Sequence, residues 1–73
     1  MKKESYVGEV LTSKFDSVPM LDVHRESLGS LSFGDAVLVL REPDNWGYLQ
    51  VLSPRGVVAW VFESNMKRIN EQD

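Results

Sequence analysis

The sequence predicts a small all-β domain, and two observations carry this prediction. Glycine and proline recur so often that the 73-residue chain is divided into segments too short for a stable helix. Within those segments the apolar residues are mostly β-branched, aromatic or leucine, which are the types that favour strands. A chain of this length has room for one domain with a compact core, because it buries only about 60% of the surface that its unfolded form exposes.

Short strands are expected along most of the chain. The predicted strands are Tyr6–Thr12, Met20–His24, Ala36–Arg41, Trp46–Leu52, Val57–Phe62 and a last one at Met66–Ile69. Residues 6–69 are expected to form a single domain, with flexible ends at residues 1–5 and 70–73. Small antiparallel sheets avoid exposed edges by curling, so we expect a partly open barrel of five to six antiparallel strands.

Two turns connect the three central strands. The segment "SPRG" fits a type I turn, because Ser53 suits the first position, Pro54 has the φ of the second and Gly56 suits the fourth. The segment "REPDN" also reverses the chain, because Pro43 cannot donate a hydrogen bond to a sheet. The sequence therefore predicts three consecutive antiparallel strands in this region.

Alternation along the last two of these strands separates an aliphatic face from an aromatic face. Successive side chains of a strand point to opposite faces. One face holds Leu49, Val51, Val57, Ala59 and Val61, and the other holds Trp46, Tyr48, Gln50, Val58, Trp60 and Phe62. The aliphatic set is the better core, so the aromatic set is expected to lie outside it.

Charge and composition exclude several classes of partner. The formal net charge is −3, and the adjacent basic pairs Lys2–Lys3 and Lys67–Arg68 lie near the chain ends. Nucleic acids and anionic membranes are bound through clustered basic residues, so neither is expected as a partner of this acidic chain. The chain has no cysteine, which excludes disulfides and thiolate chemistry.

The expected location depends on whether the chain is complete. No apolar stretch follows Lys2 and Lys3 as it would in a signal peptide, and the run "AVLVL" is too short to span a bilayer. A complete chain is therefore expected to be cytoplasmic. A domain excised from a larger secreted protein would instead be extracytoplasmic.

A series of short motifs follows in a recognisable order from Val18 to Ile69. The motifs are "LDV" at 21–23, "LSFGD" at 31–35, "AVLVL" at 36–40, "NWGYLQV" at 45–51, a turn with "RG", "AWV" at 59–61 and "SNM" at 64–66. Their order and spacing resemble the Src homology 3 (SH3) family, most closely its bacterial branch. The resemblance implies an SH3-like barrel with a short 3₁₀ turn before the last strand. Residues 6–12 would then be an extra N-terminal strand.

Departures from the family pattern bear on the ligand that the resemblance implies. Eukaryotic members bind proline-rich PxxP helices in an aromatic groove. Here Leu21 and Val23 stand at the tyrosine positions of the opening motif. Phe62 stands at the groove proline and Asn65 at the late tyrosine, so only Trp46 remains in register. The resemblance therefore argues against a PxxP ligand.

The candidate contacts for a partner are the aromatic residues of the outer face. Trp46, Tyr48 and Phe62 are the main candidates, since such side chains dominate protein interfaces. Trp60 is a further candidate, although its counterpart in the family often packs structurally. The alternative for both tryptophans is that they cover the open end of the barrel.

Asp22 and Glu26 are candidate contacts for a basic partner. They alternate with His24, the only histidine, so in an extended segment the three side chains would face one way. A metal site of carboxylate and imidazole ligands is the alternative, and an acidic contact surface is favoured over it. No metal or other cofactor is expected.

Catalysis is not expected. No serine lies in a nucleophile-elbow pattern, and His24 would have to serve as the base for any of them. The segment "GSLSFG" lacks the lysine and the following helix of a phosphate-binding loop.

The function predicted is therefore a non-catalytic binding module for a protein or peptide. One alternative is a structural or regulatory subunit of a bacterial or phage assembly that docks by adding an edge strand to a larger protein. A second alternative is cell-wall targeting as part of a secreted protein. The shortness of the segment His24–Ser30, which resembles a ligand-contacting loop of the family, argues against it.

Overall fold

The computed structural model describes residues 6–69 and confirms the all-β prediction. The strands are β1 (Val10–Ser13), β2 (Val18–Leu21), β3 (Ser27–Leu31), β4 (Ala36–Arg41), β5 (Tyr48–Leu52), β6 (Val58–Phe62) and β7 (Met66–Arg68). A 3₁₀ turn, η1 (Glu63–Asn65), lies immediately before β7, where the family resemblance implied such a turn. The predicted flexible ends, 1–5 and 70–73, lie outside the described residues. In the described part of the chain, no helix has the length and apolar character that a membrane span requires.

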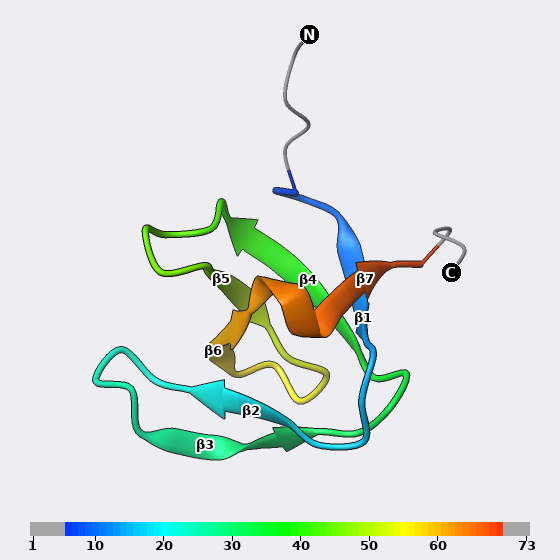
Figure 1. Ribbon diagram of the computed structural model, residues 1–73, viewed down its shortest axis with the longest axis horizontal. Helices are drawn as coiled ribbons and strands as arrows, with labels where there is room; N and C mark the ends of the chain where they lie inside the picture. Colours follow the sequence, from blue (N-terminus) through cyan, green and yellow to red (C-terminus); the bar gives the residue numbers. More distant parts are fainter. Residues whose placement is uncertain (1–5, 70–73) are drawn as a thin grey trace, which may run out of the picture.

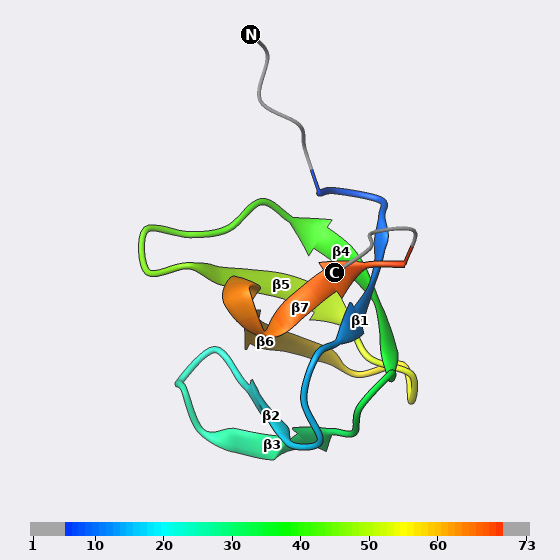
Figure 2. The same cartoon turned by 45° about the vertical axis from the view of Figure 1, so that its right-hand side comes forward.

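All seven strands belong to one antiparallel sheet, which curls into a partly open barrel (Figure 1, Figure 2). The strand order is β3-β2-β6-β5-β4-β1-β7. The predicted run of three consecutive antiparallel strands is confirmed as β4, β5 and β6. Because β1 pairs with both β4 and β7, the N-terminal strand is an integral part of the sheet.

The aliphatic face of the sheet forms the core, as the alternation predicted. The buried apolar residues are Leu11, Val18, Leu31, Val37, Val39, Leu49, Val51, Ala59, Val61 and Met66. Each large aliphatic side chain in this set contributes roughly 1.5–3 kcal/mol through burial. The prediction that Val57 belongs to this face is wrong. It is 45% exposed, because it lies in the loop before β6 rather than in the strand.

Other predictions of strand position are corrected by the structure. The predicted strand Tyr6–Thr12 begins only at Val10, in β1, because residues 6–9 form a turn in which the Glu9 amide donates to the Tyr6 carbonyl. The predicted strand Met20–His24 is shifted to β2, because Asp22 starts a turn that the chain enters directly after Leu21. Trp46 precedes β5 rather than belonging to it. Strand β3 was not predicted, because its sequence "SLGSL" lacks alternation and only its last residue is buried.

Three five-residue turns share one pattern of hydrogen bonds. We name them by their first residues as the Asp22 turn (residues 22–26), the Asp44 turn (44–48) and the Ser53 turn (53–57). In each turn the first amide donates to the fifth carbonyl, at 2.8, 2.9 and 2.8 Å respectively, and the fourth amide donates to the first carbonyl. A side-chain oxygen of the first residue also accepts from the fifth amide. The fourth residue has a positive φ in all three, as in a type I turn followed by a left-handed residue.

Candidate functional site

Four aromatic residues gather on the outer face of β5, β6 and the Asp44 turn. The rings of Tyr48 and Phe62 meet edge to face, with 5.4 Å between their centroids, because these residues are register partners on β5 and β6. Trp60 is the register partner of Gln50 on one side and of Leu21 on the other. Trp46 is 69% exposed. The core therefore does not use this tryptophan, which is available to a partner.

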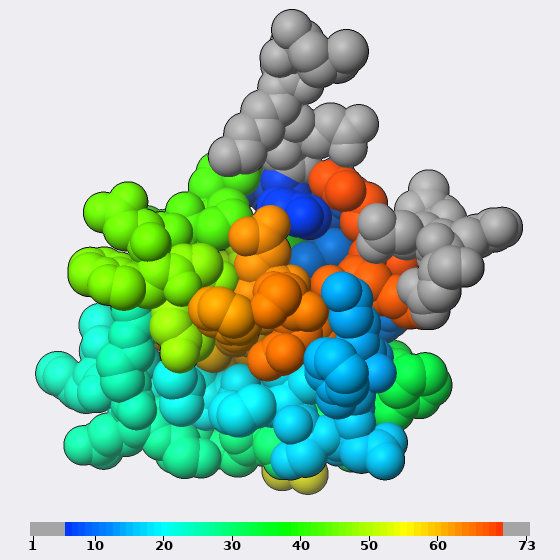
Figure 3. Space-filling model, viewed as in Figure 1, coloured from blue at the N-terminus to red at the C-terminus, as the bar shows by residue number. Residues whose placement is uncertain are grey.

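Two adjoining hollows lie along this face, and together we call them the aromatic groove. One hollow is lined by Pro19, Leu21, Tyr48, Phe62 and Asn65, and the other by Leu21, Arg25, Trp46 and Tyr48. Leu21 and Tyr48 belong to both hollows, so the two hollows adjoin at these side chains. Figure 3 shows the segments that border it meeting on one face: β2 in cyan, the start of β5 in yellow-green and η1 in orange.

The Asp44 carboxylate holds the turn that presents Trp46 and Tyr48. Asp44 Oδ1 accepts hydrogen bonds from the amides of both residues, each at 2.9 Å. Asp44 Oδ2 accepts a bond of 3.1 Å from Arg25 Nη2 in the Asp22 turn. One side chain thus positions two aromatic residues and ties together the two turns at this end of the groove.

Arg25 places a positive charge among the aromatic rings. Its guanidinium carbon lies 4.6 Å from the centroid of the Tyr48 ring and 5.7 Å from that of Trp60. Both distances lie within the range of cation–π attraction. The groove therefore combines aromatic surface with a fixed guanidinium.

The pKa of the Asp44 carboxyl is lowered from its ordinary value of 3.8. The hydrogen bond from the Tyr48 amide is the largest cause, and the bond from the Trp46 amide and the Arg25 guanidinium act in the same direction, partly opposed by desolvation. These groups favour the charged form. Asp44 is therefore ionised at neutral pH, which maintains both the turn and its pairing with Arg25.

The structure brings together most of the site residues predicted from the sequence. Trp46, Tyr48 and Phe62 all line the groove. Trp60 lines neither of the two hollows and contributes through its contact with Arg25. Leu21 and Asn65 line the groove at positions where the resemblance placed ligand-binding residues.

Asp22 and Glu26 do not lie in an extended segment. They are the first and last residues of the Asp22 turn, in which Asp22 Oδ1 accepts from the amides of His24 (2.8 Å) and Glu26 (2.9 Å). Because this segment forms a turn, it does not have the extended backbone that would make the three side chains of Asp22, His24 and Glu26 face one way. Within residues 6–69 no cluster of three or more His, Cys, Asp or Glu side chains could hold a metal ion.

Sequence reasoning missed Arg25, Asp44 and Gly47 as parts of the site. Arg25 and Asp44 are 19 positions apart, and their pairing depends on how the barrel brings two turns together. The sequence did contain a signal for Asp44 and Gly47, because an aspartate three residues before a glycine, as in "DNWG", is typical of a turn of this kind. Gly47 passes so close to Phe62 that an added Cβ would lie 3.1 Å from its Cε1 atom.

Comparisons with protein-family models, with curated proteins and with solved structures found no match to this chain. The likeness to bacterial SH3 domains accordingly remains a resemblance carried by the motifs and their order.

Proposed function

We propose that the chain is a non-catalytic binding module that recognises a segment of a protein or peptide in the aromatic groove. Trp46, Tyr48 and Phe62 supply the contact area. The single observation that carries this proposal is the pair of adjoining hollows, lined by aromatic side chains that the core does not use.

The physical reason to expect binding at this groove is that ordering these side chains on binding costs little conformational entropy. Tyr48 and Phe62 already fix one another through their ring contact, and the Asp44 carboxylate holds the backbone that carries Trp46. A groove arranged before binding loses little conformational entropy when a ligand enters it. Aromatic side chains that become buried when a partner binds commonly dominate the affinity of an interface.

Asp22 and Glu26 remain predicted contacts for basic groups of the partner. Both lie in the Asp22 turn, the turn that also carries Arg25 to the groove. The charged group that lies over the aromatic rings themselves is the Arg25 guanidinium, which is paired with Asp44. We therefore expect the acidic residues to contribute at the margin of the interface.

Peptide selection on purified protein tests the proposal. Random peptides would be displayed and selected on the wild-type protein, and the affinities of those recovered would be measured for wild type and for Trp46→Ala. We expect the variant to remain folded, because Trp46 is 69% exposed, and to lose at least tenfold in affinity.

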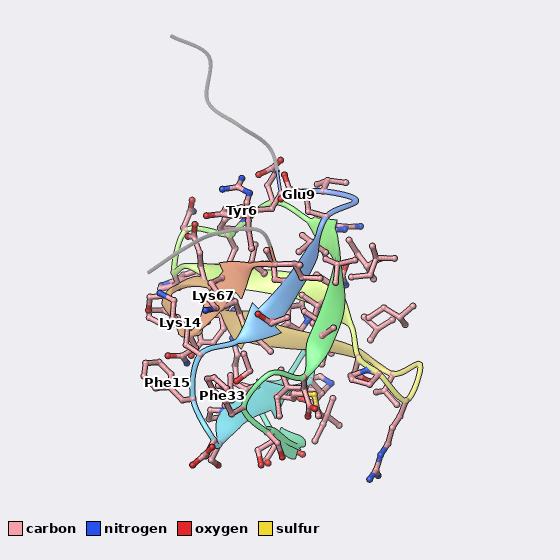
Figure 4. The ribbon with its side chains drawn as sticks, turned by 90° about the vertical axis from the view of Figure 1, so that its right-hand side faces the viewer. Tyr6, Glu9, Lys14, Phe15, Phe33 and Lys67 are labelled. Atoms are coloured by element: carbon pink, nitrogen blue, oxygen red, sulfur yellow. The ribbon has the colours of Figure 1, made fainter. Side chains whose placement is uncertain are left out.

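Phe33→Ala is a matched control. Phe33 is 63% exposed and lies in the β3–β4 loop, on the side of the molecule shown in Figure 4, opposite the β4–β5 loop that carries Trp46. Its loss should leave peptide affinity unchanged. Equal retention of peptides by wild type and Trp46→Ala, with both proteins folded, would reject the aromatic groove as the site.

Docking through an edge strand is a second candidate, favoured by the position of β3. This strand stands at one end of the sheet order, and four of its five residues are exposed. It could pair with a strand of another protein. Replacing Ser30 with Pro would remove one amide of this strand, so weaker assembly by that variant, with peptide binding in the groove unchanged, would support this candidate over the first.

A further inference from the structure

The Asp22 turn differs from the other two turns at its fourth residue. Gly47 and Gly56 occupy this position in the Asp44 and Ser53 turns, with φ of 89° and 83°, whereas the Asp22 turn has Arg25 at φ 67°. The left-handed region is strained for a residue with a Cβ and open to glycine. For the stability of the fold alone, glycine would be more favourable than arginine at this position. The strain at Arg25 therefore points to a use for its side chain in the native protein.

The Arg25 guanidinium is held in place but has hydrogen-bonding capacity to spare. It has five N–H donors. Within residues 6–69, its one hydrogen bond is that from Nη2 to Asp44 Oδ2. The Tyr48 and Trp60 rings restrict its position, while its side chain remains 40% exposed. The remaining donors are available to a ligand.

These donors border the hollow that is lined by Leu21, Trp46 and Tyr48 together with Arg25. A guanidinium matches a carboxylate in shape, since it can donate two parallel hydrogen bonds to the two oxygens. An incoming cation would instead meet a like charge. It would also find the faces of Tyr48 and Trp60 already occupied by Arg25.

We propose that Arg25 binds a carboxylate of the partner segment in the hollow beside Trp46 and Tyr48. This inference rests on the proposed function and names the chemical group that the groove selects. The carboxylate belongs to an Asp or Glu side chain or to the C-terminus of the bound segment. Neighbouring apolar groups of that segment pack on Leu21 and Trp46.

Asp44 competes with the ligand for the same guanidinium. In Asp44→Asn the side-chain oxygen can still accept from the amides of Trp46 and Tyr48, while the charge facing Arg25 is removed. The variant should keep the turn and bind a carboxylate several-fold more tightly than wild type does. Arg25→Gln, which keeps a long polar side chain without the charge, should lose the preference for a carboxylate.

The experiment uses random eight-residue peptides, displayed either with a free C-terminus or with a flanking segment after them. Peptides selected on the wild-type protein would be synthesised with each carboxylate in turn converted to the amide, as Glu to Gln, Asp to Asn or C-terminal acid to carboxamide. We expect one conversion to weaken binding to wild type roughly tenfold or more. The same conversion should have no effect on binding to Arg25→Gln. The conversion that matters identifies the source of the carboxylate.

Two results would overturn the assignment in different ways. Peptides that require Trp46, yet keep their affinity after every conversion to the amide or prefer Lys or Arg at the position beside Arg25, would remove the role of Arg25 and leave the proposed function standing. Recovery of no peptide that depends on Trp46 would reject the groove and the assignment together. Amide NMR spectra verify that Arg25→Gln and Arg25→Gly are folded. Arg25→Gly is free of backbone strain at this position.

Discussion

Gly47 shows how one residue without a side chain supports the groove. A Cβ at this position would lie 3.1 Å from Phe62, and the residue has φ of 89°. Gly56 has a similar φ of 83°, but a Cβ there would meet nothing within 4 Å. The two glycines thus share the same backbone requirement and differ in their surroundings.

Gly47→Ala is therefore expected to destabilise the protein more than Gly56→Ala. The backbone cost alone is about 1 kcal/mol of unfolding free energy in each variant. Gly47→Ala must in addition displace the Phe62 ring, so it should also weaken peptide binding. Urea unfolding and peptide titration of both variants measure the difference. Equal losses in the two variants would mean that the Phe62 ring moves aside freely and is not fixed by its neighbours.

Asp44 predicts a dependence of stability on pH. Its pKa in the folded protein is lowered below 3.8 by the Tyr48 and Trp46 amides and by Arg25. A group with a lowered folded pKa stabilises the protein above its ordinary pKa, and this contribution is lost as the pH falls through the folded value. Wild type should therefore lose more stability than Asp44→Asn between about pH 5 and pH 2. Urea midpoints across this range test it, and parallel curves for the two proteins would contradict it.

Strand β5 contributes to the core and to the groove with alternate residues. Leu49 is fully buried, whereas Leu38 on the neighbouring strand β4 is 37% exposed. Leu49→Ala should therefore cost about 3 kcal/mol of unfolding free energy, a large part of the stability of so small a domain. Leu38→Ala, the same chemical change at an exposed position, should cost less than about 1 kcal/mol. Similar costs in chemical denaturation would mean that the core is not packed as described.

Elements were predicted from the sequence where local pattern and tertiary burial agree. Strand β4 has the predicted bounds, because its buried residues Val37 and Val39 alternate with exposed ones between two turns. Strand β3 lacks this pattern, since an edge strand paired only with β2 does not need two distinct faces. The aromatic half of the groove could be predicted by the same alternation. Arg25 could not, because its place depends on the meeting of two separate turns.

At the scale of the whole molecule, the first strand joins the last strand to the rest of the sheet. β1 pairs with β4 on one side and β7 on the other, and contributes the buried Leu11. Arg68 Nε donates to Glu9 Oε1 at 2.6 Å and the guanidinium lies 4.6 Å from the centroid of the Tyr6 ring. Figure 4 shows Tyr6 and Glu9 together at this end of the molecule. The segment before Val18 is thus joined to the last strand by side-chain contacts as well as by the sheet.

A chain that begins at Val18, where the resemblance to SH3 domains begins, is therefore expected not to fold. It would lack β1 and leave the facing edges of β4 and β7 unpaired. A chain that begins at Tyr6 keeps the whole sheet and should fold as the full chain does. Circular dichroism and amide spectra of the two truncated proteins provide the test. A folded chain from Val18 onward would show that β1 is dispensable.

The three equivalent turns also affect how the binding specificity of this protein can change. In the Asp22 and Asp44 turns, main-chain groups and the side chain of the first residue make the hydrogen bonds that fix the loop. The side chains between the first and fourth positions make none of these bonds. Val23 and His24 in one turn, and Asn45 and Trp46 in another, can therefore be exchanged without altering loop length or strand register. Two short variable stretches on a constant frame are the arrangement from which new ligand preferences can be selected, by evolution or in a library randomised at these four positions.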